Sequence, residues 1–163
     1  MDVSLEKYPE WAKLALGIRG TATNHIIGDG WWSWWIPLKG GDTSVGVVFD
    51  QRIVDWEEGG SVAERLKTFL MKHPVAAEML EHAEYDAEDV HWRRNLAYYS
   101  TTFSGDGFVL VGDAAAFMDP FYSPGMDWIS FTTSGAANLI TQQRSGLDLG
   151  PLVEKHNRDF STC

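Results

Sequence analysis

Asp113 lies between an apolar run and a proline-rich turn, and this position makes its carboxylate the leading candidate for ligand binding in the sequence. The run Phe108–Val111 is bounded by glycines and leads directly into Gly112 and Asp113. Such a run is typical of a strand covered on both faces in a parallel sheet, and open α/β sheets bind ligands at the carboxyl ends of such strands. Asp113 could accept hydrogen bonds there from the hydroxyl groups of a ribose or ribitol. Alternatively, Asp113 could simply cap a turn.

A stiff turn follows this carboxylate and leads into a predicted helix. The segment Pro120–Gly125 contains two prolines, and the helix is expected from about Met126 to Arg144. The first turn of a helix offers unpaired N–H groups and a partial positive charge, which could stabilise negative charge on a bound ring. Small side chains on this helix would permit close packing on a sheet; they are Ser130, Ser134, Gly135, Ala136 and Ala137.

Tryptophans dominate a β-hairpin that is predicted in the first half of the chain. Two β-rich runs, Trp31–Leu38 and Thr43–Asp50, flank a Gly-Gly turn. Because side chains alternate along a strand, the first run has two distinct faces. The faces carry Trp32, Trp34 and Ile36 on one side, and Trp31 and Trp35, predicted to belong to the core, on the other.

The segments around the hairpin and the turn have their own local patterns. Ser61 and Glu64 form a capping box ahead of a helical run, and Pro74 is placed to open a second short helix. The acidic run Glu81–Asp89 is predicted to be a solvated loop. Loose alternation along Val90–Ser100 predicts a further strand.

Composition and charge limit which classes of function fit the chain. It has 163 residues, with 13 Lys and Arg against 23 Asp and Glu, and therefore a formal net charge of −10. A surface this negative repels phosphate backbones and anionic lipids, so we expect neither nucleic-acid nor membrane binding. Cys163 is the only cysteine, which excludes a disulfide framework and a cysteine zinc site, and the histidines show no metal-ligand spacing. We expect a cytoplasmic protein without a metal.

Two motifs together give the chain a resemblance to flavin-dependent halogenases. Gly112–Asp113 followed by Pro120–Asp127, with the sequence PFYSPGMD, resembles the second FAD-binding motif of flavin monooxygenase-like enzymes, which usually carry Asn where this chain has Asp127. The segment Trp32–Pro37, WSWWIP, matches the W-x-W-x-I-P motif of the halogenases. The resemblance extends over roughly Gly30–Leu149, which is most of the chain.

The resemblance implies a mixed α/β fold in which part of a Rossmann-like FAD-binding domain joins a substrate-binding layer of a β-hairpin and helices. It places residues 1–105 in the substrate-binding layer and residues 106–163 in the FAD-binding domain. The catalytic residues stay unassigned. The implied cofactor-binding residues are Gly112, Asp113, Pro120, Ser123, Pro124, Gly125, Met126 and Asp127, and the implied wall between flavin and substrate is Trp32, Trp34 and Ile36.

The activity implied is that of an FAD-dependent oxidoreductase, in which reduced FAD and oxygen act on a small aromatic substrate and a separate flavin reductase supplies the reduced flavin. Asp113 would hold the ribityl or ribose region of FAD. The chain contains no G-x-G-x-x-G loop to cradle the pyrophosphate, so we expect it to be the C-terminal portion of such an enzyme and inactive by itself.

The same resemblance leaves two alternatives open. In halogenases the halide rests on backbone N–H groups of a Ser/Thr-Gly pair, but this chain has Pro124 and Gly125 there, and proline has no N–H. One alternative is therefore an FAD-dependent reductase of the geranylgeranyl reductase type, which transfers hydride to an alkene. The other is a small acidic binding module that has no redox activity.

Overall fold

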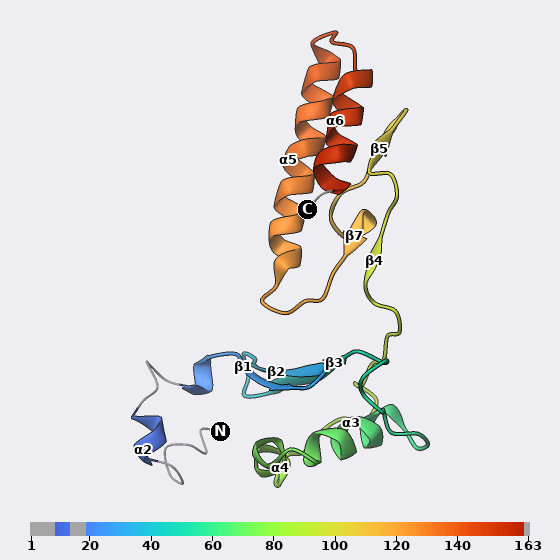
Figure 1. The fold of residues 1–163 in the computed structure, drawn as a ribbon. Coiled ribbons are helices and arrows are strands. Elements are labelled where there is room, and N and C mark those ends of the chain that lie inside the picture. Colours follow the sequence, from blue (N-terminus) through green and yellow to red (C-terminus); the bar gives the residue numbers. More distant parts are fainter. Residues whose placement is uncertain (1–8, 14–18, 162–163) are drawn as a thin grey trace. The chain divides into compact units, whose positions relative to one another are not determined.

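A computed structural model of the chain describes residues 9–13 and 19–161 and divides into two compact units (Figure 1). Unit 1 is Met1–Trp92 and unit 2 is Arg93–Cys163. Unit 1 begins with the short helix α2, Pro9–Ala12, and the 3₁₀ turn η1, Arg19–Thr21. Helices and strands occur together in the chain, which confirms the mixed α/β class.

An antiparallel sheet with the strand order β1-β2-β3 forms the centre of unit 1. The strands are β1 (Asn24–Gly28), β2 (Trp31–Pro37) and β3 (Thr43–Phe49). The predicted hairpin of β2 and β3 is confirmed, and Trp34 lies directly opposite Gly46. No expectation covered β1, because five residues with little apolar alternation give a weak strand signal.

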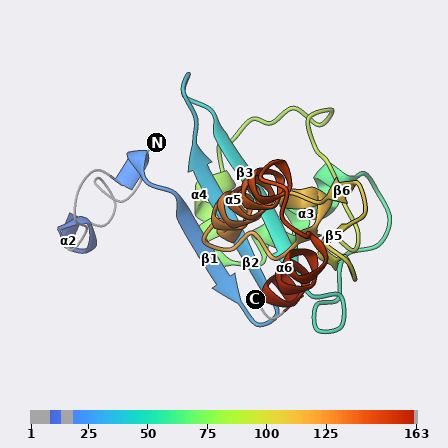
Figure 2. The same cartoon turned by 90° about the horizontal axis from the view of Figure 1, so that it is seen from above.

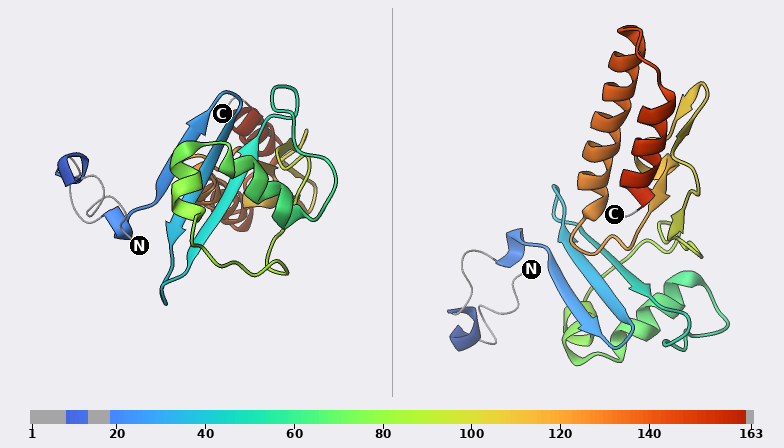
Figure 3. Two further views of the ribbon diagram at one scale, coloured as in Figure 1. Left: turned by 90° about the horizontal axis from the view of Figure 1, so that it is seen from below. Right: turned by 45° about the horizontal axis from the view of Figure 1, so that its top comes forward.

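Two short helices cover one face of this sheet (Figures 1 and 3). Helix α3, Val62–Met71, begins at the predicted capping box: Ser61 Oγ accepts from the Glu64 N–H at 3.2 Å, and the Glu64 carboxylate accepts from the Ser61 N–H at 2.8 Å. Helix α4, Pro74–Leu80, has Pro74 in its first turn, as predicted. Because both starts depend on local contacts, the sequence is enough to locate them.

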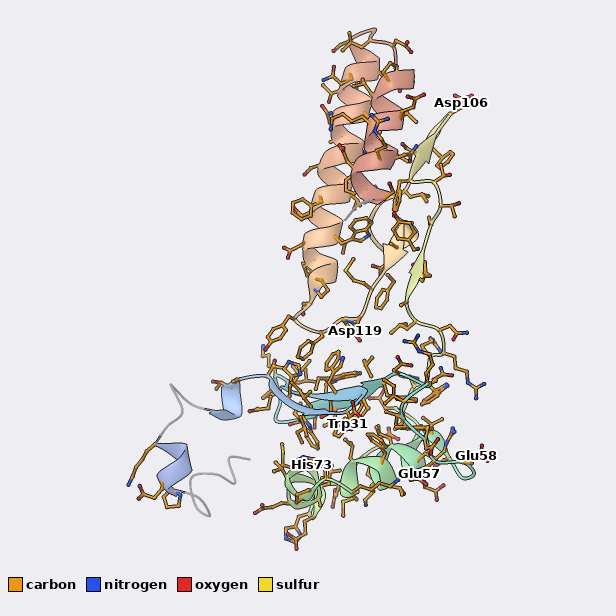
Figure 4. The ribbon with its side chains drawn as sticks, in the orientation of Figure 1. Trp31, Glu57, Glu58, His73, Asp106 and Asp119 are labelled. Atoms are coloured by element: carbon orange, nitrogen blue, oxygen red, sulfur yellow. The ribbon has the colours of Figure 1, made fainter. Side chains whose placement is uncertain are left out.

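The core of unit 1 lies between the sheet and these two helices. Trp35 is 3% exposed and Leu70 is 1% exposed, and they are buried together with Phe69 and Ala76. Trp31 meets Phe69 edge-on with 5.0 Å between ring centroids, and Figure 4 shows Trp31 pointing from β2 toward the helices. The predicted core positions of Trp31 and Trp35 are confirmed.

The connection between the two units corrects one prediction and confirms another. The acidic run Glu81–Asp89 is exposed along its whole length, as expected for a solvated loop. The single strand predicted over Val90–Ser100 is wrong, because only Tyr98–Tyr99, β4, is a strand. Trp92 packs instead on Trp56, with 5.3 Å between ring centroids, so its ring belongs to the aromatic core of unit 1 and not to a strand face.

Unit 2 consists of two long helices beside short antiparallel strand pairs (Figure 2). The pairs are β4 with β7 and β5 with β6. Helix α5, Pro124–Arg144, begins two residues before the predicted start and ends at the predicted residue. The remaining elements are β5 (Ser104–Gly105), β6 (Phe108–Val109), η2 (Gly112–Ala114), β7 (Ala116–Phe117), α5 (Pro124–Arg144) and α6 (Gly150–Ser161).

The expectation that Phe108–Val111 forms a covered strand of a parallel sheet is wrong for this structure. Strand β6 is antiparallel to β5 and contains two residues, and Phe108 is 49% exposed. Gly107 has a φ of +76°, which permits the tight turn between the two strands. An apolar run becomes a covered strand only where neighbouring strands flank it, and among the described residues β5 is its only strand partner.

Helix α6 is attached to the rest of unit 2 by hydrogen bonds between Asn157 and backbone groups of the segment that contains β5. The side-chain oxygen of Asn157 accepts hydrogen bonds from the N–H groups of Phe103 and Ser104, both at 2.8 Å. Its amide nitrogen donates to the Ser104 carbonyl at 2.9 Å. Phe103, which is 1% exposed, packs in the core with Trp128 and Phe160. One side chain therefore satisfies three backbone groups beside the core.

Replacing Asn157 with Ala should destabilise unit 2 by about 1–3 kcal/mol, because two buried or half-buried N–H groups lose their acceptor. Urea unfolding followed on amide NMR signals of α6 measures this change. Asn138→Ala is the control, since Asn138 is exposed on α5 and makes only an exposed contact with Gln142. Equal stability of the two variants would contradict the role given to Asn157.

The stability of unit 2 should also decrease on mild acidification, through His156. This side chain is 6% exposed beside Phe160, and burial lowers its pKa below the ordinary value of 6.5, against a smaller opposing effect of Asp159. As the pH falls through about 6.5, the unfolded chain takes up a proton that the folded chain resists, so the free energy of unfolding decreases. The urea midpoint of α6 signals, measured from pH 8 to pH 5, tests this.

The variant His156→Leu should lose that part of the pH dependence, whereas His82→Leu in the exposed acidic loop should retain it. An unchanged pH profile in His156→Leu would show that another group causes the effect.

Candidate functional site

Asp113 lies in an exposed turn of unit 2. It is the middle residue of η2, and both Asp113 and Ala114 are exposed, whereas Gly112 and Ala115 are buried. Within the described part of the chain, no hydrogen bond or ion pair engages the Asp113 carboxylate. The carboxylate is therefore available to accept hydrogen bonds from a ligand.

The residue before this carboxylate is held by two side chains of α5. The Gly112 N–H donates to Thr132 Oγ1 at 2.9 Å, and the Gly112 carbonyl accepts from the indole N–H of Trp128 at 3.0 Å. Thr132 is 0% exposed and Trp128 is 6% exposed, so water competes little for these two bonds. Both backbone polar groups of Gly112 are thus bound to one helix.

Position 112 favours glycine for two reasons. Its φ is +56°, a left-handed conformation that other residues rarely adopt, and an added Cβ would come within 3.0 Å of Ile129 Cγ1. On the other side of Asp113, the hydroxyl of Tyr98 donates to the Asp113 backbone carbonyl. The backbone around the carboxylate is therefore fixed from α5 and from β4.

The proline-framed turn adopts a strained backbone. Tyr122 and Ser123 have φ values of 60° and 57°, both left-handed, which is unfavourable for residues with a side chain. The Asp119 carboxylate accepts from the Phe121 N–H at 2.9 Å, and the Pro120 carbonyl accepts from the Ser123 N–H at 2.8 Å. Strained pairs of this kind cluster at functional sites, which makes this turn a candidate for ligand contact.

The first turn of α5 is open to a ligand. Pro124 occupies its first position, and the side chain of Ser123 makes no capping hydrogen bond. A Cβ added to Gly125 would find no atom within 4 Å, and Met126 is 70% exposed. Asp127 is also exposed in the first turn, where a negative charge is favourable. Ser123 therefore leaves the start of the helix without a side-chain cap, and the exposed Asp127 carboxylate is the charged group of this turn.

The structure attaches both parts of the predicted FAD-binding motif, Gly112–Asp113 and Pro120–Asp127, to helix α5. The bonds from Gly112 to Trp128 and Thr132 attach η2 to the same helix that Pro124–Asp127 begins. An exposed carboxylate suits the hydroxyl groups of a ribityl chain, and an open helix N-terminus suits the electron-rich edge of a flavin ring. These donors and acceptors fit the sugar-alcohol and ring portions of FAD. Among the described residues, no cluster of His, Cys, Asp or Glu could hold a metal.

A groove of about 510 Å³ is the part of unit 2 that the sequence analysis missed. Aromatic side chains line most of it, and Figure 4 labels Asp119 at the chain segment that leads toward α5. Its lining joins four segments far apart in the sequence, and the pairing of β4 with β7 brings two of them together, which no local pattern predicts. The residues that define it are Tyr98, Tyr99, Phe117, Trp128 and Phe160.

The predicted tryptophan wall lies in unit 1, on the sheet face opposite α3 and α4. Trp32 and Trp34 are half-buried, with 5.9 Å between ring centroids, and Ile36 is 36% exposed. The sharing of one face by these three residues is therefore confirmed, while their role against a flavin or substrate stays a prediction. His25 of β1 meets Trp32 edge-on, with 5.4 Å between ring centroids, and this neighbour was not expected because β1 was not predicted.

Comparison with known proteins relates this arrangement to one family. A sequence model described as tryptophan halogenase matches residues 18–162. The flavin-dependent halogenase chlA of Dictyostelium discoideum is 35% identical over 131 residues, covering 71% of this chain and 21% of that protein. The sulochrin halogenase gedL of Aspergillus terreus is 34% identical over 119 residues, covering 71% and 22%.

A solved structure is similar to this chain over most of its length. The flavoprotein/dehydrogenase of Cytophaga hutchinsonii matches with a TM-score of 0.66 and 25% identity, covering 86% of this chain and 35% of that one. The chain spans about a fifth of the length of these curated relatives, 21% of one and 22% of the other. No helix among the described residues has the length and apolarity to cross a membrane.

The family model extends over nearly all of the described residues, and it includes both the turn that carries Asp113 and the tryptophan face of the sheet. The chain therefore belongs to the tryptophan halogenase family.

Proposed function

We propose that this chain is part of an FAD-dependent oxidoreductase resembling the flavin-dependent halogenases, and that unit 2 binds the ribityl chain and the isoalloxazine ring of FAD. One observation carries the proposal: the backbone N–H and carbonyl of Gly112 are both bound to side chains of α5, which attaches the exposed Asp113 carboxylate to the same helix that Pro124–Asp127 begins. Family membership supports it.

Each part of this site has a specific role in the proposal. Asp113 accepts hydrogen bonds from ribityl hydroxyl groups, and the first turn of α5 stabilises negative charge on the ring. FAD itself, when bound, supplies the electrons that pass to oxygen. The residues proposed to line the ring are Pro120, Ser123, Pro124, Gly125, Met126 and Asp127, all within residues 106–163.

The tryptophan face of unit 1 is proposed to bind the substrate. Trp32, Trp34 and Ile36 offer flat aromatic and apolar surface, which suits a small aromatic molecule through ring packing. Residues 1–105 would form this substrate layer, and a separate flavin reductase would supply reduced FAD. The single cysteine and the absence of a disulfide framework suit a cytoplasmic location.

The turn before α5 favours a second candidate reaction. A halide site built from backbone N–H groups loses one donor at Pro124, and the Ser123 N–H already donates to the Pro120 carbonyl at 2.8 Å. This favours the alternative of a flavin-dependent reductase of the geranylgeranyl reductase type, which transfers hydride and needs no halide. The similar solved protein from Cytophaga hutchinsonii is named a flavoprotein/dehydrogenase, which is compatible with this alternative.

Riboflavin and FAD should bind the 163-residue chain weakly and with similar affinity, because the chain has no G-x-G-x-x-G loop for the pyrophosphate. Asp113→Ala should weaken riboflavin binding by roughly 10- to 100-fold, as expected for the loss of a charged hydrogen-bond acceptor. Titration followed by flavin fluorescence measures both effects.

Asp106→Ala is the matched control, because Asp106 is an exposed aspartate of the same unit in the turn between β5 and β6 (Figure 4). Asp106→Ala should bind riboflavin like the wild type. Unchanged binding in Asp113→Ala would contradict the proposed site, and much tighter binding of FAD than of riboflavin would reveal a phosphate cradle that the proposal does not contain.

A further inference from the structure

Trp34 crosses over the neighbouring strand β3, and a glycine makes this position possible. Gly46 is the direct cross-strand partner of Trp34 and is buried. A Cβ added to Gly46 would come within 2.1 Å of Trp34 Cζ2 and 2.3 Å of Trp34 Cη2, so any side chain at this position would displace the ring. Gly46 does not have a left-handed φ, so the ring and not the backbone requires glycine there.

A serine two residues earlier fixes the orientation of the same ring. The indole N–H of Trp34 donates to Ser44 Oγ at 3.2 Å. Ser44 pairs with Ile36 in the register of β2 and β3, so Ser44 lies on the same sheet face as Trp34 and Gly46. Because an indole has one N–H donor, this bond determines which edge of the ring lies toward Ser44.

The placement of Trp34 also affects the second tryptophan of this face. The ring planes of Trp32 and Trp34 are inclined at 55° with 5.9 Å between their centroids, so a displaced Trp34 would disturb the packing of both rings. Val48, which pairs with Trp32, is larger than the two residues that face Trp34 and Ile36. The two small residues of β3 on this face, Ser44 and Gly46, therefore lie where the Trp34 ring crosses the strand.

We infer that Gly46 and Ser44 are positioning residues that set the height and the orientation of Trp34 on this face, and thereby the space left above it for a flat aromatic substrate. The part of the inference that concerns substrate rests on the proposed function of the tryptophan face. The part that concerns Trp34 rests only on the contacts within the sheet.

The indole N–H signals of the ¹⁵N-labelled chain test the positioning of Trp34, once Trp34→Phe has identified its signal. Ser44→Ala should speed solvent exchange of the Trp34 indole proton by roughly 2- to 10-fold, which corresponds to the loss of one ordinary hydrogen bond. Ser44→Thr should restore slow exchange, because threonine retains the hydroxyl. Gly46→Ala should shift the Trp34 signal and leave that of Trp35, on the opposite face, near its original position.

Gly20→Ala is the control glycine substitution, since no atom lies within 4 Å of the added Cβ. It should leave the Trp34 signal unchanged. The positioning role is overturned if Ser44→Ala exchanges at the wild-type rate, if Ser44→Thr fails to restore slow exchange, or if Gly46→Ala shifts Trp35 as much as Trp34. The serine variants decide the question if Gly46→Ala does not fold.

Titration with indole as a probe tests the link to substrate. In the wild type, indole should shift the Trp34 signal on binding, and Gly46→Ala should bind indole more weakly than Gly20→Ala does. Equal affinity of these two variants would overturn the role in specificity. If the wild type does not bind indole, the proposed substrate face is wrong, while the exchange rates still decide whether Ser44 and Gly46 position Trp34.

Discussion

The binding of Gly112 by two side chains of α5 is the constraint on which the proposed flavin site depends. Because Thr132 and Trp128 satisfy the N–H and the carbonyl of Gly112 in a buried place, the following residue cannot move independently of the helix. The backbone of Asp113 is therefore held in place while its carboxylate is exposed, which is what the proposed contact with a ligand requires. The hydroxyl of Thr132 also donates to the backbone carbonyl of Trp128 at 2.7 Å, which orients the Thr132 side chain against its own helix.

A similar arrangement operates in the other unit, although with different residues. On the sheet of unit 1, a glycine and a serine of β3 determine where Trp34 lies, as Gly112 and Thr132 determine where Asp113 lies. In both places a glycine leaves room for a neighbouring side chain, which is Trp34 at Gly46 and Ile129 at Gly112. A hydrogen bond to a side-chain hydroxyl then holds the Trp34 ring and the Gly112 backbone in position. The groups proposed to contact ligands, Asp113 and Trp34, are thus positioned by neighbouring residues that are not themselves proposed to contact the ligand.

Local signals in the sequence were sufficient for some elements and not for others. The capping box at Ser61, the proline start at Pro74 and the alternation in the β2–β3 hairpin each depend on residues close in sequence, and all three are present. The partner of β6 and the groove between β4 and β7 depend on contacts between distant segments. The motif that makes Asp113 a candidate is local, whereas the side chains that bind the backbone of Gly112 come 16 and 20 residues later in the chain.

The most direct test of this account is a double-mutant cycle on riboflavin binding with Asp113→Ala and Thr132→Val. Valine keeps the shape of threonine but cannot accept the Gly112 N–H, so the single variant should weaken binding by releasing Asp113. The account predicts strong coupling, in which Thr132→Val has little further effect once Asp113 is absent. Additive losses in the double variant would show that Thr132 does not act through Asp113 and would contradict the account.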